Sequence, residues 1–150
     1  MSDLKAFEKD LKSLFVSQHL GVLATQNHGQ PYTSLVAFSS SEDLKYLFFA
    51  TTRATRKYAN LTNDSRVAML VDNRSNTPSD FQWAMGVTAT GVAEELASSE
   101  RETCLAAYLA KHPHLEDFVS SPSCAFLRIR VEIYYIVTRF QNVVEIHVRS

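Results

Sequence analysis

The sequence has few cysteines, glycines and prolines, and it has no long apolar run. Its 150 residues include two cysteines, four glycines and four prolines. Cys104 and Cys124 have no second pair near them, which argues against a zinc ribbon, a CxxC redox motif and a disulfide-rich scaffold. No stretch of about 18 apolar residues occurs, and the N-terminus lacks the apolar run of a signal peptide. We therefore expect a reduced, cytoplasmic protein that is not inserted in a membrane.

An excess of charge of one sign is also absent. Fifteen basic and 16 acidic residues give a formal charge of -1, so no overall field favours nucleic acid or an anionic membrane as a partner. Any anionic ligand must be held by a local cluster. With 45% hydrophobic residues and no repeat, low-complexity tract or Pro/Gly-rich linker, residues 1–150 are predicted to form a single domain.

The apolar periodicity predicts a mainly β chain with flanking helices, of the α+β class. Helical spacing of apolar residues predicts an N-terminal amphipathic helix up to Phe15, a short helix over 55–62 and a third over 99–112. The expected strands cover 22–25, 32–38, 44–50, 67–71, 85–95 and 127–137. Six to seven mostly antiparallel strands fit a small barrel better than a parallel sheet.

Two of these strands carry a prediction about burial. Residues 67–71 are almost wholly apolar, which predicts a strand that is buried on both faces. The last strand alternates, and one face is predicted to hold Leu127, Ile129, Val131, Ile133, Tyr135 and Val137.

The most informative segment is FFATTRATRKYANL, residues 48–61, where a strand gives way to a helix. Arg56 and Lys57 fall in the first turn of that helix, where the partial positive charge of the helix end disfavours cations. An anion at this position would reverse the effect, because backbone amides, threonine hydroxyls and two cations together suit a phosphate. The alternative is that both are ordinary solvated helix residues.

This segment resembles the pyridoxamine 5'-phosphate oxidases and related FMN-binding split barrels, in which a helix opening Ser/Thr-Arg-Lys follows a strand ending aromatic-x-Thr. Other pieces match in the same order. HLGVLATQNHGQPYTSLVAF is similar to the first hairpin of the family, NDSRVAMLV to its "NPRV" strand, and VTATGVAEEL to its strand ending Gly-x-Ala-Glu. The resemblance covers about residues 15–115, and it implies an FMN-binding split β-barrel.

The resemblance also implies a set of cofactor-binding residues. Arg56 and Lys57 would hold the phosphate of FMN. Further contacts are implied for Ala50, Thr51, Thr52 and Thr55 around the turn, and for Ser34, Leu35 and Val36 along the isoalloxazine. Ser34 is small and polar and is easier to explain facing a ligand, whereas Leu35 suits core packing.

A homodimer is implied as well, with FMN in a groove between protomers. Arg139, Phe140 and Gln141 are then candidates for contacts from the partner protomer, although Phe140 also suits dimer or barrel packing. Gly86 stands where the family has a flavin-contacting glutamine, and Gln82 and Trp83 could substitute from the preceding loop. For Trp83, a packed rim aromatic is an equal alternative.

Other departures argue against pyridoxine phosphate as the substrate. Tyr108 matches a substrate-phosphate residue of the oxidases, but His112 and Glu116 replace an arginine and a serine, and a carboxylate repels a phosphate. No side chain can be assigned as catalytic acid or base. Trp83, Tyr108 and His112 are the candidates for shaping a substrate pocket.

Two functions from different classes fit these observations. The first is an FMN-dependent oxidoreductase acting with a small-molecule substrate or electron donor, and the second is a non-catalytic flavin- or haem-binding or sensor protein of the same fold. For haem, a histidine near the C-terminus such as His147 would be the residue to examine. No metal site is predicted, because His112, His114 and Glu116 lack a further ligand at matching spacing.

Overall fold

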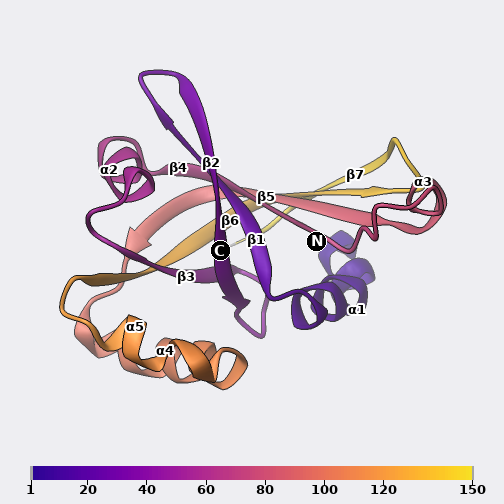
Figure 1. The fold of residues 1–150 in the computed structure, drawn as a ribbon. Coiled ribbons are helices and arrows are strands. Elements are labelled where there is room, and N and C mark those ends of the chain that lie inside the picture. Colours follow the sequence, from indigo (N-terminus) through magenta and orange to yellow (C-terminus); the bar gives the residue numbers. More distant parts are fainter. Residues whose placement is uncertain (1, 150) are drawn as a thin grey trace.

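The computed structural model describes residues 2–149 as one antiparallel sheet that curls into a barrel, with helices outside it (Figure 1). The strand order is β3-β2-β1-β4-β5-β6-β7, and β3 also pairs with β6, so six strands close a ring that β7 extends. The strands are β1 Leu20–Asn27, β2 Gln30–Ser40, β3 Tyr46–Thr52, β4 Arg66–Asp72, β5 Met85–Glu95, β6 Cys124–Thr138 and β7 Asn142–His147. The helices are α1 Ser2–Ser17, α2 Arg56–Asn63, α3 Asp80–Trp83, α4 Ser98–Lys111, the 3-10 helix η1 Pro113–Leu115 and α5 Glu116–Ser120.

The predicted mainly β fold with six to seven antiparallel strands is confirmed. Strand β6 organises the barrel, because its first half pairs with β3 and its second half with β7, while β5 runs along its other edge. Among the described helices, none combines the length and the apolar character needed to cross a bilayer.

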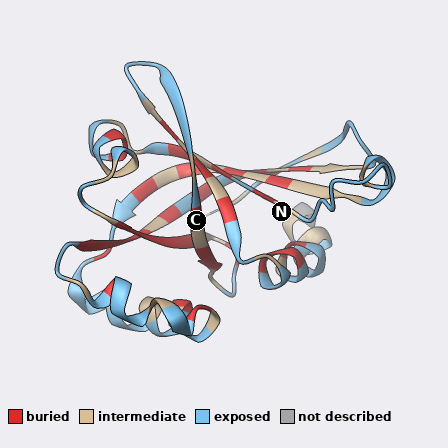
Figure 2. Cartoon of the chain, in the orientation of Figure 1, coloured by how far each residue is buried: buried red, intermediate tan, exposed pale blue. Residues whose placement is uncertain are grey.

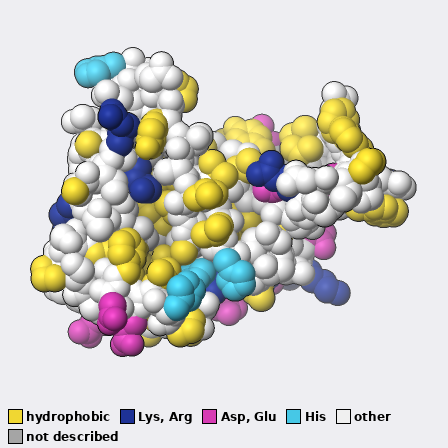
Figure 3. All heavy atoms as spheres, viewed as in Figure 1, with side chains coloured by type: hydrophobic (Ala, Val, Ile, Leu, Met, Phe, Trp, Pro, Cys, Tyr) yellow, Lys and Arg dark blue, Asp and Glu magenta, His cyan; other side chains and the backbone are white. Residues whose placement is uncertain are grey.

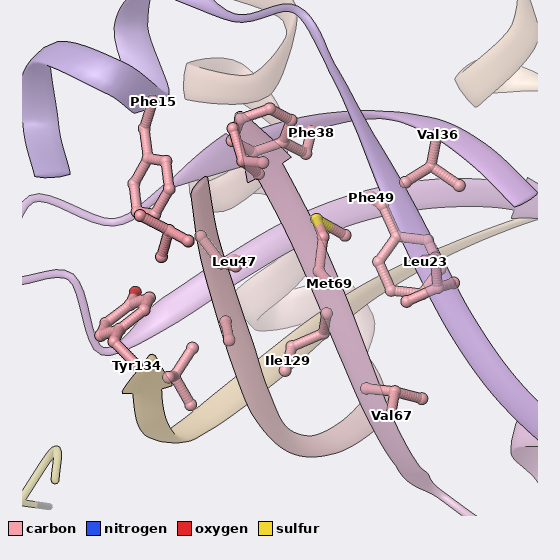
Figure 4. Packing of buried hydrophobic residues seen from close by; sticks show 14 of the residues in the cluster. Phe15, Leu23, Val36, Phe38, Leu47, Phe49, Val67, Met69, Ile129 and Tyr134 are labelled. Atoms are coloured by element: carbon pink, nitrogen blue, oxygen red, sulfur yellow. The ribbon is translucent and has the colours of Figure 1, made fainter. Parts of the chain in front are cut away.

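The main core lies inside the barrel (Figures 2 and 4). Leu23, Phe38 and Phe49 are fully buried there, and Phe15 of α1 packs edge-on against Phe38 with ring centroids 5.8 Å apart. A second cluster lies outside the barrel between β3, β6 and the helix pair α4–α5, with Phe48, Phe126 and Tyr108 among its members. Strand β3 is therefore buried on both faces.

A bulge in β6 changes which of its side chains face the core. Thr90 lies opposite Ile133 and Gly91 lies opposite Val131, so Glu132 is an extra residue in β6. Beyond the bulge Tyr134 and Ile136 are buried, while Ile133 and Tyr135 are only partly so. The predicted alternation is thus correct as far as Val131 and wrong after it.

Three further features differ from the sequence-based expectations. Strand β4 buries one face only, because Leu70 keeps 37% of its surface exposed in the single chain. The helices η1 and α5 were not expected after Pro113. The expected loop after β4 contains helix α3, and the Asp80 carboxylate orders this segment by accepting the backbone N–H groups of Ser75 and Asn76 at 2.9 and 2.7 Å.

Candidate functional site

The turn between β3 and α2, residues 51–57, is shaped by its own threonines. Thr55 is the N-cap of α2, and its Oγ1 accepts the backbone N–H of Tyr58 at 3.3 Å. The same hydroxyl donates to the Thr52 carbonyl at 3.0 Å and lies 2.8 Å from Thr51 Oγ1. The hydroxyls of Thr51 and Thr55 therefore hold the turn in shape. In the described chain, the Thr52 hydroxyl makes no hydrogen bond and is available to a ligand.

The first turn of α2 has unused capacity to bind an anion. The backbone N–H groups of Arg56 and Lys57 donate to no acceptor within residues 2–149. Nor does either side chain form an ion pair with a described carboxylate. Partial burial lowers the pKa of Lys57, because the charged amine is removed from water without a compensating anion. A bound anion at this place would stabilise the charged amine.

A pocket of about 240 Å³ opens beside Lys57, and we call it the Lys57 pocket. Its lining contains one charged side chain, Lys57, and no carboxylate; the residues are Leu35, Val36 and Ala37 of β2, Ala50, Thr51 and Thr52 of β3, Thr55, Lys57, Tyr108, Leu115 and Phe118. An apolar wall joined to one cation and a row of threonines suits a ligand with an aromatic body and an anionic tail. Six of the predicted cofactor residues besides Lys57 meet here: Leu35, Val36, Ala50, Thr51, Thr52 and Thr55.

Arg56 points to the other side of the helix start. It lines a neighbouring groove of about 350 Å³ with Asn27, Asn60 and Asn63, and its guanidinium carbon lies 5.9 Å from the centre of the Tyr32 ring. The two cations thus flank Thr55, whose surface contributes to both hollows. Figure 3 shows Lys and Arg side chains gathered on this part of the molecule, near α2 and the tip of the β1–β2 hairpin.

A network that the sequence did not reveal ties this turn to the barrel. The Glu95 carboxylate forms an ion pair with Arg53 through one oxygen and accepts the Tyr58 hydroxyl through the other at 2.8 Å. Arg53 also donates to the Pro122 carbonyl at 3.0 Å, and its backbone N–H bonds to the Ser123 carbonyl at 3.0 Å. Glu95 directly follows the Gly-x-Ala-Glu motif of residues 91–94, and the motif does not indicate that Arg53 and Tyr58 are its partners.

Along β2, the structure reverses the expected roles of two neighbours. Leu35 is 67% exposed and lines the Lys57 pocket, so the expectation of core packing for Leu35 is wrong. Ser34 lies on the opposite face of the strand and does not line the pocket, and its buried Oγ has no hydrogen-bond partner. Successive strand residues point to opposite faces, so the Ser34 side chain points away from the face that presents Leu35. Val36 packs in the core and borders the pocket.

Tyr108 and His112 have structural partners that constrain any role in substrate binding. Tyr108 lines the Lys57 pocket, but its hydroxyl already donates to the Ala37 carbonyl at 3.0 Å. His112 is buried with Nε2 2.8 Å from the Phe38 carbonyl, and burial lowers its pKa. The prediction that His112 shapes a substrate pocket is not supported by its position, because it does not reach the Lys57 pocket. Leu115 and Phe118, which do line the pocket, were not predicted because no element was expected after Pro113.

The remaining predicted residues form a second group at the opposite end of the molecule (Figure 1). Gln82 and Trp83 end α3, and the neighbouring Phe81 packs against Phe140 with ring centroids 5.0 Å apart. Arg139, Phe140 and Gln141 make the β6–β7 turn, all with positive φ. Trp83 is 68% exposed. Within one chain, this group does not reach the Lys57 pocket.

Histidines and acidic residues form no metal centre in the part of the chain that the structure describes. His147 lies exposed on β7, with Nε2 2.5 Å from a Glu145 carboxylate oxygen.

Fold and pocket together define a split β-barrel protein with a hollow beside the β3–α2 turn. The family model for pyridoxamine 5'-phosphate oxidase matches residues 7–138, and the chain therefore belongs to this family. The resemblance found in the sequence motifs is thereby confirmed. No curated protein sequence matches the chain.

Solved structures with the same fold include proteins of different ligand classes. A heme binding protein from Mycobacterium smegmatis superposes with a TM-score of 0.80 at 19% identity, over 91% of this chain and 55% of that one. ChuZ from Campylobacter jejuni gives 0.79 at 15% identity, over 95% of this chain and 60% of that one. A FAD-binding protein from Mesorhizobium loti gives 0.67 at 20% identity, over 86% and 90%. The chain thus spans little more than half of the heme binding protein, and at these identities the likeness concerns the fold.

Proposed function

We propose that this chain is a cytoplasmic FMN-binding flavoprotein that acts as an oxidoreductase on a small molecule. The observation that carries the proposal is the Lys57 pocket, in which a cation and unbonded helix amides meet threonines and an apolar wall without any carboxylate. A flavin mononucleotide has the matching parts, a dianionic phosphate and a flat apolar ring system. Membership of the family supports this choice of ligand.

Electrostatics favours an anion over an empty turn. Each of two cations at the positive end of a helix costs some tenths of a kcal/mol. A phosphate at the same place attracts both cations and the helix end, and these attractions outweigh that cost. Lys57 would bind the phosphate from the pocket side and Arg56 from the groove side, with the Thr52 hydroxyl and the amides of the first turn completing the donors.

The redox chemistry would be supplied by the flavin ring, and the protein would supply position and environment. No acidic side chain lines the Lys57 pocket, and the Tyr108 hydroxyl is engaged by the Ala37 carbonyl. A substrate must therefore be accommodated mainly by apolar contacts from Leu35, Leu115 and Phe118. This lining does not favour a phosphorylated vitamer, whose anion would need a second set of cations.

We further propose that the working unit is a homodimer. The exposed Leu35 lies opposite Val22 of β1, and Val22 lies opposite the exposed Leu70 of β4, so an apolar row starts in the pocket and crosses the barrel surface. Figure 3 shows apolar side chains gathered at the centre of this face. A second copy on this face would bury the row and could bring its own α3 and β6–β7 turn to the pocket, which Gln82, Trp83, Arg139, Phe140 and Gln141 cannot reach from within the same chain.

The test of the cofactor assignment is the double variant Arg56→Ala/Lys57→Ala. Each charged hydrogen bond to a phosphate contributes about 1.5–3 kcal/mol, so we expect FMN affinity to fall at least about 100-fold while folding is retained. The matched control is Arg66→Ala/Arg74→Ala, which removes the same charge from two exposed ion pairs elsewhere. Titration with FMN, followed by flavin fluorescence, measures both. Normal flavin occupancy in the first variant would refute the phosphate assignment.

Haem is the second candidate, because the heme binding protein from Mycobacterium smegmatis has the same fold at a TM-score of 0.80. The absorption spectrum of the purified protein separates the two, since flavin and haem absorb in different bands. Mass spectrometry of whatever is released on denaturation identifies the molecule. A haem without flavin would overturn the FMN proposal, and reduction of bound flavin by NADH or NADPH would distinguish an oxidoreductase from a carrier.

A further inference from the structure

Glu95 bridges two residues that bracket the first turn of α2. Its two carboxylate oxygens are used separately: one binds the Arg53 guanidinium, before the N-cap Thr55, and the other accepts the Tyr58 hydroxyl, after Lys57. A single side chain on β5 therefore holds both ends of the segment that contains the unbonded amides. Its position fixes the segment relative to the barrel.

Arg53 connects the same segment to a third strand. Its side chain donates to the Pro122 carbonyl and its backbone N–H to the Ser123 carbonyl, both at 3.0 Å and both just before β6 begins. The turn is thus held from β5 by a carboxylate and from the start of β6 by two carbonyls. A surface ion pair alone contributes little to stability, but four polar contacts that converge on one short segment restrict its geometry.

The bridge also has an electrostatic consequence. Arg53 and Glu95 neutralise each other, so that Glu95 can hold the turn without presenting an unpaired negative charge to an anion bound at Lys57. Hydrogen bonding to Glu95 raises the pKa of Arg53, so the guanidinium stays charged.

We infer that Glu95 is a positioning residue for the phosphate end of the cofactor, acting through Arg53 and Tyr58 without touching the ligand. The inference rests on the proposed function, because it assumes an anion at the first turn of α2. It predicts a loss of affinity specific to the phosphate: a displaced turn weakens contacts to the anionic tail and leaves the apolar wall made by β2 and α5 intact.

The experiment compares FMN with riboflavin, which lacks the phosphate, by flavin fluorescence titration of the full chain. The measured quantity is the preference for FMN, which is the dissociation constant of riboflavin divided by that of FMN. For Glu95→Ala we expect this ratio to fall about tenfold, with riboflavin affinity changed less than about twofold, because one charged contact is worth roughly a factor of ten. Glu95→Gln keeps an acceptor oxygen and should recover part of the ratio. The matched control is Glu94→Ala, which removes the adjacent carboxylate of β5 and its 3.0 Å pair with Arg128.

The outcomes separate this inference from the proposed function. The positioning role is overturned if Glu95→Ala leaves the ratio unchanged. That result includes the case in which the variant loses affinity for FMN and for riboflavin by the same factor. Should Glu95→Ala not fold, Tyr58→Phe, which removes only the hydroxyl that Glu95 accepts, decides in its place: we expect its ratio to fall about threefold. If the unaltered chain does not prefer FMN over riboflavin, or if Lys57→Ala keeps the preference, the phosphate site itself is wrong.

Discussion

Lys111 lies at the end of α4, where its side chain runs back to α1 and β2. Its Nζ donates to the Phe15 carbonyl at 2.7 Å and lies 3.9 Å from the centre of the Phe38 ring, and burial lowers its pKa to about 8. Between this value and the unfolded value of 10.5 the folded chain has lost a proton that the unfolded chain keeps. The contribution of Lys111 to the free energy of unfolding therefore rises between about pH 8 and 10.5. Below about pH 8 this contribution does not depend on pH.

The test at this residue is a comparison with Lys111→Met, which keeps an apolar stem of similar length. Partial solvent access reduces the effect, so we expect the unfolding free energy of the unaltered chain to gain on the order of 1–2 kcal/mol relative to the variant between pH 7.5 and 10.5. Urea unfolding at several pH values measures the difference. Parallel stability curves for the two proteins would contradict the prediction.

Single residues also show where sequence reasoning stops. The composition of residues 51–57 was enough to predict a cationic turn, and the structure places Lys57 beside a pocket there. Whether a strand residue faces the core or the pocket depends on register, so polarity alone did not indicate that Leu35 is exposed while the Ser34 Oγ is buried. The role of Glu95 was not predicted, because its partners Arg53 and Tyr58 are 42 and 37 residues away in the chain.

At the scale of elements, β5 was predicted with its observed bounds, because an unbroken apolar alternation marks both ends. The neighbouring β6 was predicted only in part, since one extra residue at Glu132 inverts the alternation after Val131. Sequence patterns show a bulge poorly, because a bulge is defined by the partner strand. The α3 and α5 helices are too short to develop a periodic signal.

Gly91 is the element-level feature that permits this bulge. A Cβ at Gly91 would lie 2.1 Å from the Arg130 carbonyl oxygen, a backbone atom that cannot move without opening the β5–β6 ladder. We expect Gly91→Ala to lower the free energy of unfolding by at least about 2 kcal/mol. Gly86→Ala on the same strand is the control, because its Cβ would meet nothing closer than 3.9 Å and should change stability by no more than about 0.5 kcal/mol. Thermal unfolding followed by circular dichroism measures both, and equal melting temperatures would refute the close approach.

For the whole molecule, the most informative difference between prediction and structure lies in the apolar strand 67–71. Its sequence predicted burial on both faces, yet in the single chain Leu70 remains exposed beside Val22 and Leu35. Sequence patterning records the final environment of a residue, including any surface covered by another copy of the chain. The same row leads into the Lys57 pocket, so covering it would also enclose the site.

The dimer is tested at Leu70, which lies in the apolar row but does not line the Lys57 pocket. We expect the unaltered chain to have about twice its 16.9 kDa mass in solution and Leu70→Asp to have the monomer mass, because a carboxylate buried in an apolar interface without a partner costs several kcal/mol. Val16→Asp is the control: Val16 is 76% exposed on α1, outside the row. Light scattering after size exclusion measures the mass. On the proposed dimer, FMN should also bind more weakly to the monomeric variant, since the α3 and β6–β7 residues of a second copy would be lost from the pocket. A Leu70→Asp protein that remains dimeric would place the interface on another face.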